Sequence, residues 1–258
     1  MDIDHTHVNE TLATTRAVRR RLDFERPVDN QLLLDCIDLA EQAPTGGNLG
    51  SRRWIIVRDQ AVKDQLGELY RDAALGFMAQ AAARLRGTGH PQEKVMASAE
   101  FLAEHLAEVP AIVVPTIIGR HDGGGRPGLV DSVIQAAWSF CLALRARGLG
   151  TTWMTAVFEH EVKVKEILGI PEHMTEIVMF PVAWTKGTDF HRAPRHPARA
   201  ITFFDRFGVT SEHGPGPTID FADGPGITVE IDIAASPRSV WPLVTDVEVA
   251  TICSTPTQ

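Results

Sequence analysis

Residues 130–153 read VDSVIQAAWSFCLALRARGLGTTW and contain the most apolar helix that the sequence predicts, Val130 to Arg147. Apolar residues occupy nearly every face of this helix, a pattern typical of a helix that is central in a fold or buried in an interface. Gly148 follows at the position where a left-handed glycine commonly ends a helix. We expect a short strand next, over Thr151 to Met154.

Outward from this helix, the sequence predicts an α+β chain with few βαβ units. Apolar runs predict strands at 54–57, 111–118 and 176–184. Helical periodicity predicts further helices at 11–22, 30–42, 62–86, 93–107 and 161–168. Asn30 is expected to cap the second of these helices. Pro115 lies inside the strand 111–118 and favours an edge position or a bulge, because proline has no N–H to donate.

Composition excludes several classes of protein. Hydrophobic residues make 44% of the 258 residues and the net charge is −8, so a packed core is expected and nucleic acid is not the expected partner. Cys36, Cys141 and Cys253 lie far apart without the spacing of a disulfide framework or a metal site. The start, Met1 to Glu10, has no apolar segment, and no apolar run approaches the ~20 residues of a membrane span. We therefore expect a cytoplasmic protein that binds neither metal nor membrane.

The composition changes after about Gly208, which predicts a domain boundary. Residues 1–210 form the expected main domain, and 211–226 are rich in glycine and proline and are expected to be a linker. Residues 227–258 begin with an alternating strand pattern followed by a helix start. About thirty residues cannot bury a core of their own, so this tail is expected to be an incomplete domain.

A basic segment, TRAVRRR at residues 15–21, is the clearest candidate for a binding site. In the predicted helix 11–22, Arg16 and Arg20 are four positions apart and would project from one face. Arginine side chains fork onto phosphate oxygens, so this face could bind a phosphate; a solvated basic helix is the alternative. A second segment, HRAPRHP at 191–197, offers Arg195 as another phosphate ligand, or is a basic surface loop.

Residues 123–128 carry a formal GxGxxG pattern between a predicted strand and the apolar helix. As a dinucleotide-binding loop it lacks support, because Pro127 lies inside it and no acidic residue follows about twenty positions later. A surface loop is the simpler interpretation. The sequence contains no GxSxG or HExxH motif and its histidines are scattered, so any chemistry is expected to belong to a cofactor.

Four segments in this order resemble the nitroreductase family of FMN-dependent oxidoreductases over residues 11–207. They are Arg16–Arg20, Ala43–Asn48, Gly148–Trp153 and Ala193–Arg195. The resemblance implies a three-layer α+β fold, with a mostly antiparallel sheet flanked by helices. It also implies a homodimer with two FMN sites at the interface, each built from both subunits.

The resemblance implies where the FMN phosphate would bind. Arg16, Arg20 and Arg195 would converge on it, and Ala17 and Val18 would lie beside it. A phosphate that is nearly a dianion needs several fixed donors, and arginine does not lose its charge at neutral pH.

For the flavin ring, the resemblance implies two further groups. Pro44, Thr45 and Asn48 would lie against the isoalloxazine from the partner subunit, and the turn Met154-Thr155-Ala156 would offer backbone N–H groups to flavin N5 and O4. Donors at these atoms stabilise the reduced ring. No side chain of the protein is expected to be catalytic, because the flavin performs the chemistry.

The implied reaction is ping-pong: NADPH or NADH passes a hydride to the flavin and leaves, and a nitroaromatic, quinone or related small-molecule acceptor is then reduced. Val18 replaces a hydroxyl residue that is frequent in the family, and Gly50 and Arg52 replace glutamine and tryptophan. These differences leave a second hypothesis open, a flavin-sequestering protein of the same fold with little or no turnover. A dehydrogenase that uses the glycine loop 123–128 is a third.

The tail is similar to the opening of a polyketide-cyclase/START-like (SRPBCC) domain, which begins with a strand and a helix. The strand is expected over Ile227 to Ile233 and the helix start near Trp241. Only this opening is present, so no ligand is assigned to it.

Overall fold

The computed structural model of the chain describes residues 5–120, 127–209, 218–220 and 228–230. The chain divides into two units, 1–192 and 193–258. The α-helices are α1 (His5–Thr14), α2 (Asn30–Ala40), α3 (Gln60–Leu85), α4 (Glu93–His105), α5 (Pro127–Ala146) and α6 (Glu161–Leu168). The short 3-10 helices are η1 (Gly46–Asn48), η2 (Leu106–Glu108), η3 (Ala156–His160) and η4 (Ala198–Ala200). The strands are β1 (Leu22–Asp23), β2 (Arg52–Val57), β3 (Ala111–Ile118), β4 (Leu149–Gly150), β5 (Met174–Glu176), β6 (Phe180–Thr185), β7 (Thr218–Asp220) and β8 (Thr228–Glu230).

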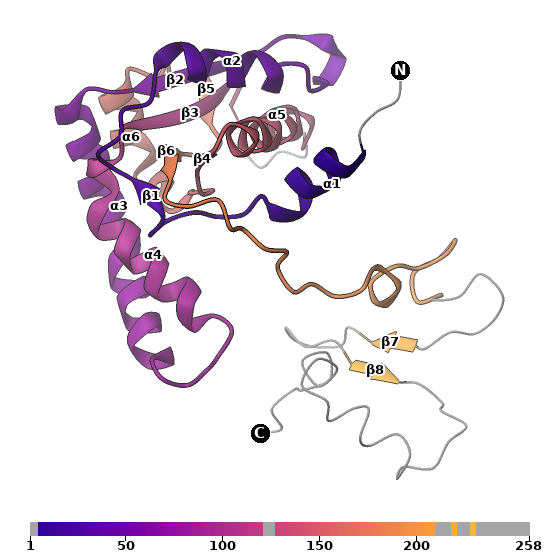
Figure 1. Ribbon diagram of the computed structural model, residues 1–258. Coiled ribbons are helices and arrows are strands. Elements are labelled where there is room, and N and C mark those ends of the chain that lie inside the picture. Colours follow the sequence, from indigo (N-terminus) through magenta and orange to yellow (C-terminus); the bar gives the residue numbers. More distant parts are fainter. Residues whose placement is uncertain (1–4, 121–126, 210–217, 221–227, 231–258) are drawn as a thin grey trace. The chain divides into compact units, whose positions relative to one another are not determined.

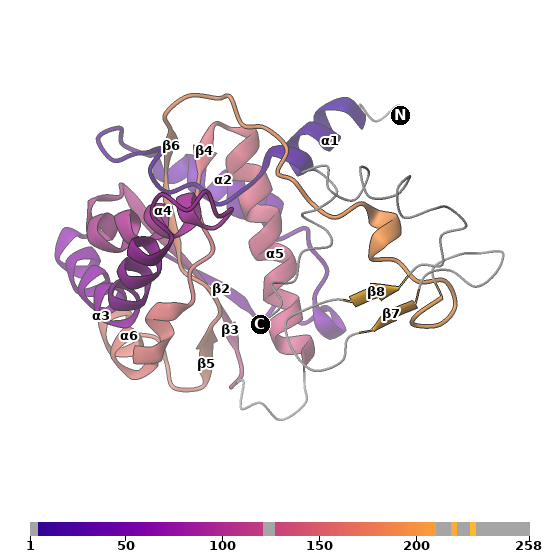
Figure 2. The same ribbon diagram turned by 90° about the horizontal axis from the view of Figure 1, so that it is seen from below.

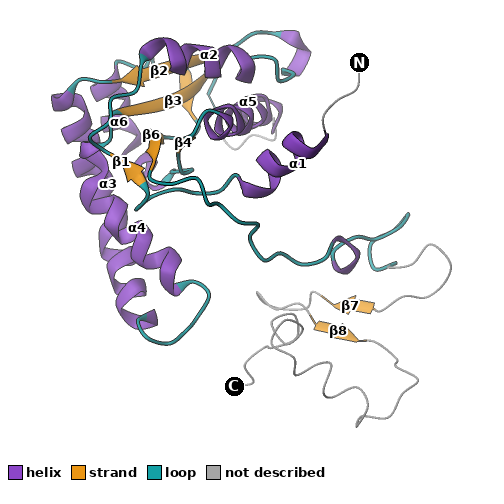
Figure 3. Cartoon of the chain, viewed as in Figure 1, coloured by secondary structure: helices purple, strands orange, loops and turns teal. Residues whose placement is uncertain are grey.

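A single antiparallel sheet organises the first unit. Its main path is β1-β6-β3-β2, with β4 pairing with β6 and β5 pairing with β3. Figure 3 shows these strands between helices. The expected α+β class with a mostly antiparallel sheet is therefore confirmed.

Helices cover both faces of this sheet. Figures 1 and 2 show α3, α4 and α6 on one face and α2 and α5 on the other. The strand β3 alternates between the two resulting cores: Ile112 and Val114 pack toward the α3 and α4 side, whereas Ala111 and Val113 pack toward α2 and α5. Because both faces are buried, the strand reads as a continuous apolar run in the sequence. This arrangement is the expected three-layer fold.

Most of the helices lie where their periodicity predicts them. α3, α4 and α6 match the predicted ranges within a few residues. The sequence places Leu32, Leu33, Cys36, Ile37 and Ala40 on one stripe of α2; all but Leu32, which is half-buried, are buried. Its cap differs: the side chain of Asp29, rather than Asn30, accepts a hydrogen bond from the Gln31 N–H at 2.8 Å.

The predicted helix 11–22 is wrong beyond Thr14, where α1 ends; the chain then continues without helix and turns at residues 19–21 before β1. The hydroxyls of Thr14 and Thr15 donate to the carbonyl oxygens of the residues four positions earlier. Such side-chain bonds to the backbone compete with the regular hydrogen bonds of a helix. The Val18 N–H donates to the Thr151 carbonyl oxygen at 2.8 Å instead of to a helical partner. This long-range bond cannot be read from local periodicity.

Of the two alternatives expected for Pro115, an edge position or a bulge, the edge position is wrong, since β3 pairs on both sides. The register shifts by one residue between the pairs Val113↔Phe180 and Thr116↔Glu176, as at a bulge. On one side β6 pairs with Ala111–Val113 and β5 pairs with Thr116–Ile118, so Pro115 lies between the two partners. Its carbonyl oxygen accepts from the Ile177 N–H at 3.2 Å. The same proline explains why the strand predicted over 176–184 is two strands, because a continuous ladder would need the N–H that Pro115 lacks.

The apolar helix is confirmed as α5, and Gly148 follows it with a φ of 79°, as predicted. The strand expected over Thr151 to Met154 is displaced, because pairing with β6 occurs at Leu149 and Gly150. The Thr151 carbonyl bonds with residue 18 instead, and Met154 forms only an isolated bridge with Met179.

The remaining sequence predictions concern the second unit and the glycine loop. β7 and β8 pair antiparallel, with Ile219 opposite Val229. The linker 211–226 and the START-like tail 227–258 lie mostly outside the described residues, as does the part of the glycine loop at 121–126, so these and the domain boundaries stay predictions. None of the helices in the described residues combines the length and the apolar character that a bilayer span needs.

Gly150 lies where three parts of the chain meet closely. A Cβ placed on it would lie 2.8 Å from Cγ2 of Thr185 and 3.0 Å from Cβ of Val18. Such distances are too short for carbon atoms, so the backbone would have to move. We expect Gly150→Ala to lower the free energy of unfolding by about 1–3 kcal/mol, measured by urea denaturation.

Gly76 provides the matched control. It is exposed in the middle of α3, and a Cβ placed there meets no atom within 4 Å. Gly76→Ala should raise the free energy of unfolding by up to about 1 kcal/mol through helix propensity. Equal effects of the two substitutions would contradict the close approach at Gly150.

Glu176 is a buried carboxyl at the end of β5. Its side chain is 1% exposed, and neither oxygen has a hydrogen-bond partner. The Nζ of Lys165 lies 3.8 Å away, which is an ion-pair distance but not a hydrogen bond. Burial raises the pKa of Glu176 above its ordinary value of 4.5, and Lys165 opposes this only in part.

This raised pKa makes stability depend on pH. The folded state holds the Glu176 proton more tightly than the unfolded state, so stability is highest below the ordinary pKa and falls as the pH rises through the folded pKa. Glu176→Gln should therefore gain stability relative to the unchanged protein over this range, by about 1.4 kcal/mol per pH unit crossed. Urea unfolding at a series of pH values measures it. Glu172→Gln, at a side chain 89% exposed, should give a flat difference.

Candidate functional site

Two segments that are far apart in the sequence form a cavity beside the end of α5. Residues 14–19 run alongside residues 149–153, joined by the bond from the Val18 N–H to the Thr151 carbonyl oxygen. The cavity has a volume of about 210 Å³. Its lining is Thr14, Thr15, Arg16, Ala17, Val18, Arg19, Trp138, Cys141, Arg145, Leu149, Gly150, Thr151, Thr152, Trp153 and Phe190. Of the predicted phosphate ligands, Arg16, Ala17 and Val18 are therefore in one place.

Four residues that line this cavity each have a buried polar side-chain atom without a hydrogen-bond partner. The atoms are Nε of Arg16, Nε of Arg145, and the hydroxyl oxygens of Thr151 and Thr152. Each of these groups can donate a hydrogen bond, and a buried donor without an acceptor is costly. No carboxylate is found among the described residues that line the cavity. The wall is therefore suited to an anion that accepts several hydrogen bonds.

An aromatic ring holds two guanidinium groups near this wall. Cζ of Arg145 lies 4.6 Å and Cζ of Arg21 lies 4.1 Å from the centroid of Phe190. Arg21 also forms an ion pair with Asp189 at 2.6 Å, so its charge is balanced. Burial lowers the pKa of Arg145; Glu10 raises it, and the charges of Arg21 and Arg16 lower it further. Arginine stays protonated at neutral pH even so, and the positive charge is retained.

The two arginines predicted to share a helical face reach the site differently, since the backbone is not helical after Thr14. Nη2 of Arg20 donates to the Ala97 carbonyl oxygen at 2.8 Å, and its Cζ lies 5.1 Å from the ring centroid of Phe101. Both partners belong to α4. Arg16 and Arg20 still line a second hollow together, with a volume of about 440 Å³. Non-helical backbone that turns at Arg20, rather than helical spacing, brings them to it.

Val18 has a packing role besides lining the cavity. Its side chain is 5% exposed and belongs to the core on the α3 and α4 side. Ala17, next to it, is exposed. Cys141 also lines the cavity, but burial raises the pKa of its thiol to about 12. The thiol is therefore neutral at physiological pH and is not a nucleophile.

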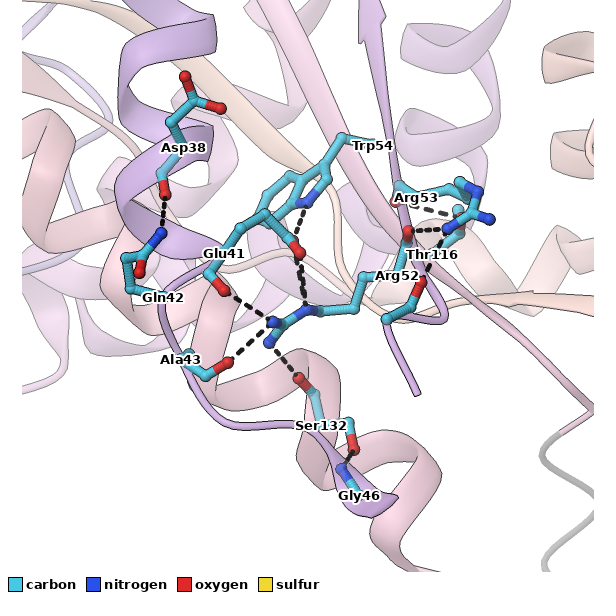
Figure 4. A network of polar contacts seen from close by, with 11 residues as sticks. Asp38, Glu41, Gln42, Ala43, Gly46, Arg52, Arg53, Trp54, Thr116 and Ser132 are labelled. Carbon is cyan, nitrogen blue, oxygen red and sulfur yellow. Dashed lines mark hydrogen bonds and ion pairs between the residues drawn. The ribbon is translucent and has the colours of Figure 1, made fainter. Parts of the chain in front are cut away.

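The loop 43–48 is fixed by a network around Arg52 (Figure 4). The buried guanidinium of Arg52 donates to the carbonyl oxygens of Ser132 at 2.9 Å, Ala43 at 2.8 Å and Glu41 at 3.2 Å. Its Nε lies 3.2 Å from a carboxylate oxygen of Glu41, which also accepts from Nε1 of Trp54 at 2.7 Å. Arg52 thus joins the end of α2, the strand β2 and the helix α5.

Three predicted ring-binding residues lie on this loop. The Gly46 N–H donates to the hydroxyl of Ser132 at 2.9 Å, which ties the loop to α5 (Figure 4). Pro44 and Asn48 are exposed, and Asn48 has a left-handed φ of 54°. The hydroxyl oxygen of Thr45 is buried without a hydrogen-bond partner.

The loop and the arginine cavity lie at opposite ends of α5 within one chain. Ser132, which holds the loop, and Arg145, which lines the cavity, are thirteen positions apart on α5. At 1.5 Å per residue this corresponds to about 20 Å along the axis. The structure does not bring Pro44, Thr45 and Asn48 to the arginine cavity of the same chain.

The other predicted site residues lie elsewhere. Met154 is buried, and its carbonyl oxygen accepts from the Met179 N–H at 2.9 Å. Thr155 is exposed and precedes η3, which begins at Ala156, where the first N–H groups have no acceptor inside the helix. Arg195 lies in the second unit, where it is exposed and donates to its neighbour's carbonyl oxygen at 2.9 Å.

Sequence reasoning missed Arg145, Thr151 and Thr152. The spacing of Trp138, Cys141 and Arg145 places them on one face of α5, and Arg145 is the charged residue on that face. This pattern could have indicated Arg145 as a site residue. Within residues 5–120 and 127–209, no group of three or more His, Cys, Asp or Glu side chains is placed to hold a metal ion.

Comparison with known proteins places this fold. The sequence matches the Nitroreductase family over residues 12–184, about two thirds of the chain. The chain belongs to the nitroreductase family. An NADH dehydrogenase from Thermus thermophilus is 27% identical over 206 residues, which cover 70% of this chain and 92% of that protein.

Solved structures share the fold. An iodotyrosine deiodinase bound to FMN and 3-iodo-L-tyrosine has 21% identity and a TM-score of 0.56, covering 73% of this chain and 95% of that one. A nitroreductase family protein from Clostridium novyi NT has 20% identity and a TM-score of 0.52, covering 78% and 94%. At these identities, the likeness shows the nitroreductase fold.

Arg52 is the centre of the network that positions the loop 43–48. We expect Arg52→Met to lower the free energy of unfolding by roughly 3 kcal/mol, because it leaves buried carbonyl oxygens without their donor and the Glu41 carboxylate without its counter-charge. Hydrogen exchange of the Gly46 amide should become faster, since the loop loses its attachment. Urea unfolding and exchange measured by mass spectrometry check the two effects.

Arg53→Met is the matched control for this prediction. Arg53 is the next residue on β2, is exposed, and donates only to nearby carbonyl oxygens of residues 50 and 52. Its substitution should change stability by less than about 0.5 kcal/mol. If the two variants unfolded at the same urea concentration, the role given to Arg52 would be wrong.

Proposed function

We propose that the protein is an FMN-dependent oxidoreductase that takes hydride from NADH or NADPH and reduces a nitroaromatic, quinone or related small molecule. Membership of the nitroreductase family supports flavin-dependent oxidoreduction, and the Thermus thermophilus relative, an NADH dehydrogenase, supports a nicotinamide donor. The iodotyrosine deiodinase with the same fold is bound to FMN, which supports this cofactor. A cytoplasmic location stays a prediction from the sequence.

The observation that carries this proposal is the set of unpaired donors in the arginine cavity. Nε of Arg16 and Nε of Arg145 lack acceptors, as do the hydroxyls of Thr151 and Thr152. A phosphate group carries two negative charges near neutral pH and three acceptor oxygens, so its chemistry fits these donors. The residues present therefore fit the phosphate of FMN. When bound, FMN supplies two-electron transfer between the nicotinamide and the acceptor in a ping-pong reaction.

The chain's own residues would hold and orient the flavin. Arg16 would bind the phosphate with Arg20, while Ala17 and Val18 form the adjacent backbone; the role of Arg195 stays a prediction from the sequence. The turn Met154-Thr155-Ala156 follows directly after the cavity wall, and the N–H at the start of η3 would donate to the ring.

We propose that the active form is a homodimer with FMN at the interface. Within one chain, the loop with Pro44, Thr45 and Asn48 lies about 20 Å along α5 from the cavity, so a partner subunit would supply it. Exposed apolar side chains on α2 and α5 support burial there: Leu39 is 50% exposed, Trp138 43% and Ile134 41%. Large apolar groups exposed together mark an interaction surface.

An anaerobic titration of FMN-reconstituted, gel-filtered protein with NADH, and separately with NADPH, tests the function. We expect the yellow flavin band to bleach stoichiometrically with at least one donor and to recover when a quinone is added. The mass from light scattering should be twice that of the chain.

Two other results would overturn the proposal in different ways. Flavin that stays bound but does not bleach with either donor would indicate the flavin-sequestering protein that the sequence left open. Protein that retains no FMN through gel filtration, at micromolar or higher concentrations, would exclude the cofactor assignment itself.

A further inference from the structure

We propose that Arg145 is a further phosphate-binding residue, which with Arg16 gives the protein its preference for FMN over riboflavin, the flavin without phosphate. This inference rests on the proposed function and extends its site by a residue from α5. The ligand chemistry is that of a phosphate monoester dianion. The following observations concern the position, partners and charge of the Arg145 guanidinium.

Two contacts fix the guanidinium of Arg145, and its Nε–H has no acceptor. Nη2 donates to the hydroxyl oxygen of Thr14 at 3.2 Å, and Cζ lies 4.6 Å from the ring centroid of Phe190. Nε is buried and has no acceptor. A side chain held in this way has already lost conformational entropy in the folded protein. Binding a ligand therefore costs little additional side-chain entropy.

A structural role as a helix-end cation does not explain Arg145. Basic side chains in the last turn of a helix commonly interact with its free carbonyl groups. Arg147 does this, because its Nη1 donates to the Ala143 carbonyl oxygen at 3.2 Å. Among the described contacts of Arg145, the hydrogen bond goes to Thr14 on α1, and the side chain lines the cavity.

The charges around the cavity favour an anion. Arg16, Arg19 and Arg145 all line it, and no carboxylate is among its described lining residues. Burial is the main cause of the lowered pKa of the Arg145 guanidinium; the exposed carboxylate of Glu10 raises this pKa, and the charges of Arg21 and Arg16 lower it. A bound dianion turns this repulsion into attraction.

The opposite wall supplies matching donors. The hydroxyls of Thr151 and Thr152 are buried without partners, on the segment that pairs with residue 18. Together with the two Nε–H groups they make four unpaired donors on residues that line one cavity, and a phosphate monoester offers three terminal oxygens, each with several lone pairs. Neither riboflavin nor a neutral substrate carries a group that satisfies this set.

The test compares FMN with riboflavin, which differ only in the phosphate. Dissociation constants are measured by flavin fluorescence for the full chain, Arg145→Gln, Arg145→Lys and the control Arg147→Gln. We expect Arg145→Gln to weaken FMN binding on the order of 10- to 100-fold and to leave riboflavin binding unchanged, because only a charged hydrogen bond to the phosphate is lost. Arg145→Lys should recover part of the loss, and Arg147→Gln should resemble the unchanged protein.

A second readout needs no flavin. Inorganic phosphate should raise the melting temperature of the flavin-free protein, because a ligand that binds only the folded state stabilises it. The increase should be lost in Arg145→Gln and kept in Arg147→Gln. An Arg145→Gln variant that does not fold would be replaced by Arg145→Lys, for which the same comparison of flavins applies.

The outcomes separate this inference from the proposed function. If Arg16→Gln weakens FMN selectively but Arg145→Gln does not, FMN binding stands and the role of Arg145 is wrong. If Arg145→Gln weakens FMN and riboflavin equally, Arg145 is only structural, which also overturns the inference. If the unchanged protein binds the two flavins equally, the phosphate site itself fails.

Discussion

A backbone hydrogen bond from the Val18 N–H to the Thr151 carbonyl oxygen, 2.8 Å long, joins the N-terminal segment to the end of α5. It forms because Gly150 has no Cβ, which lets Val18 and Thr185 approach from two sides. Once this contact is made, the chain leaves the helical conformation at Thr14, continues into β1 and pairs with β6. The same contact places Arg16 beside the wall formed by residues 149–153. The pairing of β1 with β6 and the position of Arg16 in the cavity therefore both depend on this hydrogen bond.

Local patterns predict the elements that are stabilised locally. The apolar period of α5, the buried stripe of α2 and the glycine after α6 are all visible in the sequence, because each depends on residues a few positions apart. The end of α1 and the place of Pro115 depend on partners more than fifty positions away. Proline in a central strand is acceptable here because the missing N–H faces the junction between β5 and β6. Single-sequence periodicity contains no information on that junction.

In the candidate site too, some features can be predicted from local sequence and others depend on distant residues. Arg16 is recognisable as an anion ligand from its basic segment, but the helical face it was expected to share with Arg20 does not exist. Arg145 is hidden within the apolar helix, and its distance of 129 positions from Arg16 conceals their shared cavity. Arg52, a departure from the family pattern in the sequence, is the centre of the network that positions the loop 43–48. Its consequence for the flavin is therefore indirect, through loop position.

The arginines differ in whether an acceptor pairs with the guanidinium, and this difference indicates where a ligand binds. Arg21 has Asp189 and Arg52 has Glu41, so each buried or half-buried charge has a carboxylate beside it. Nε of Arg16 and Nε of Arg145 have no acceptor among the described residues. The chain has a net charge of −8 and contains 33 Asp and Glu residues. Gathering like charges costs free energy, which the exposed carboxylate of Glu10 counters near Arg145. An anion bound in the cavity would counter it further, and would stabilise the segment after α1, the segment after β4 and the end of α5 together, because Arg16, Thr151, Thr152 and Arg145 on these parts would donate to the same ligand.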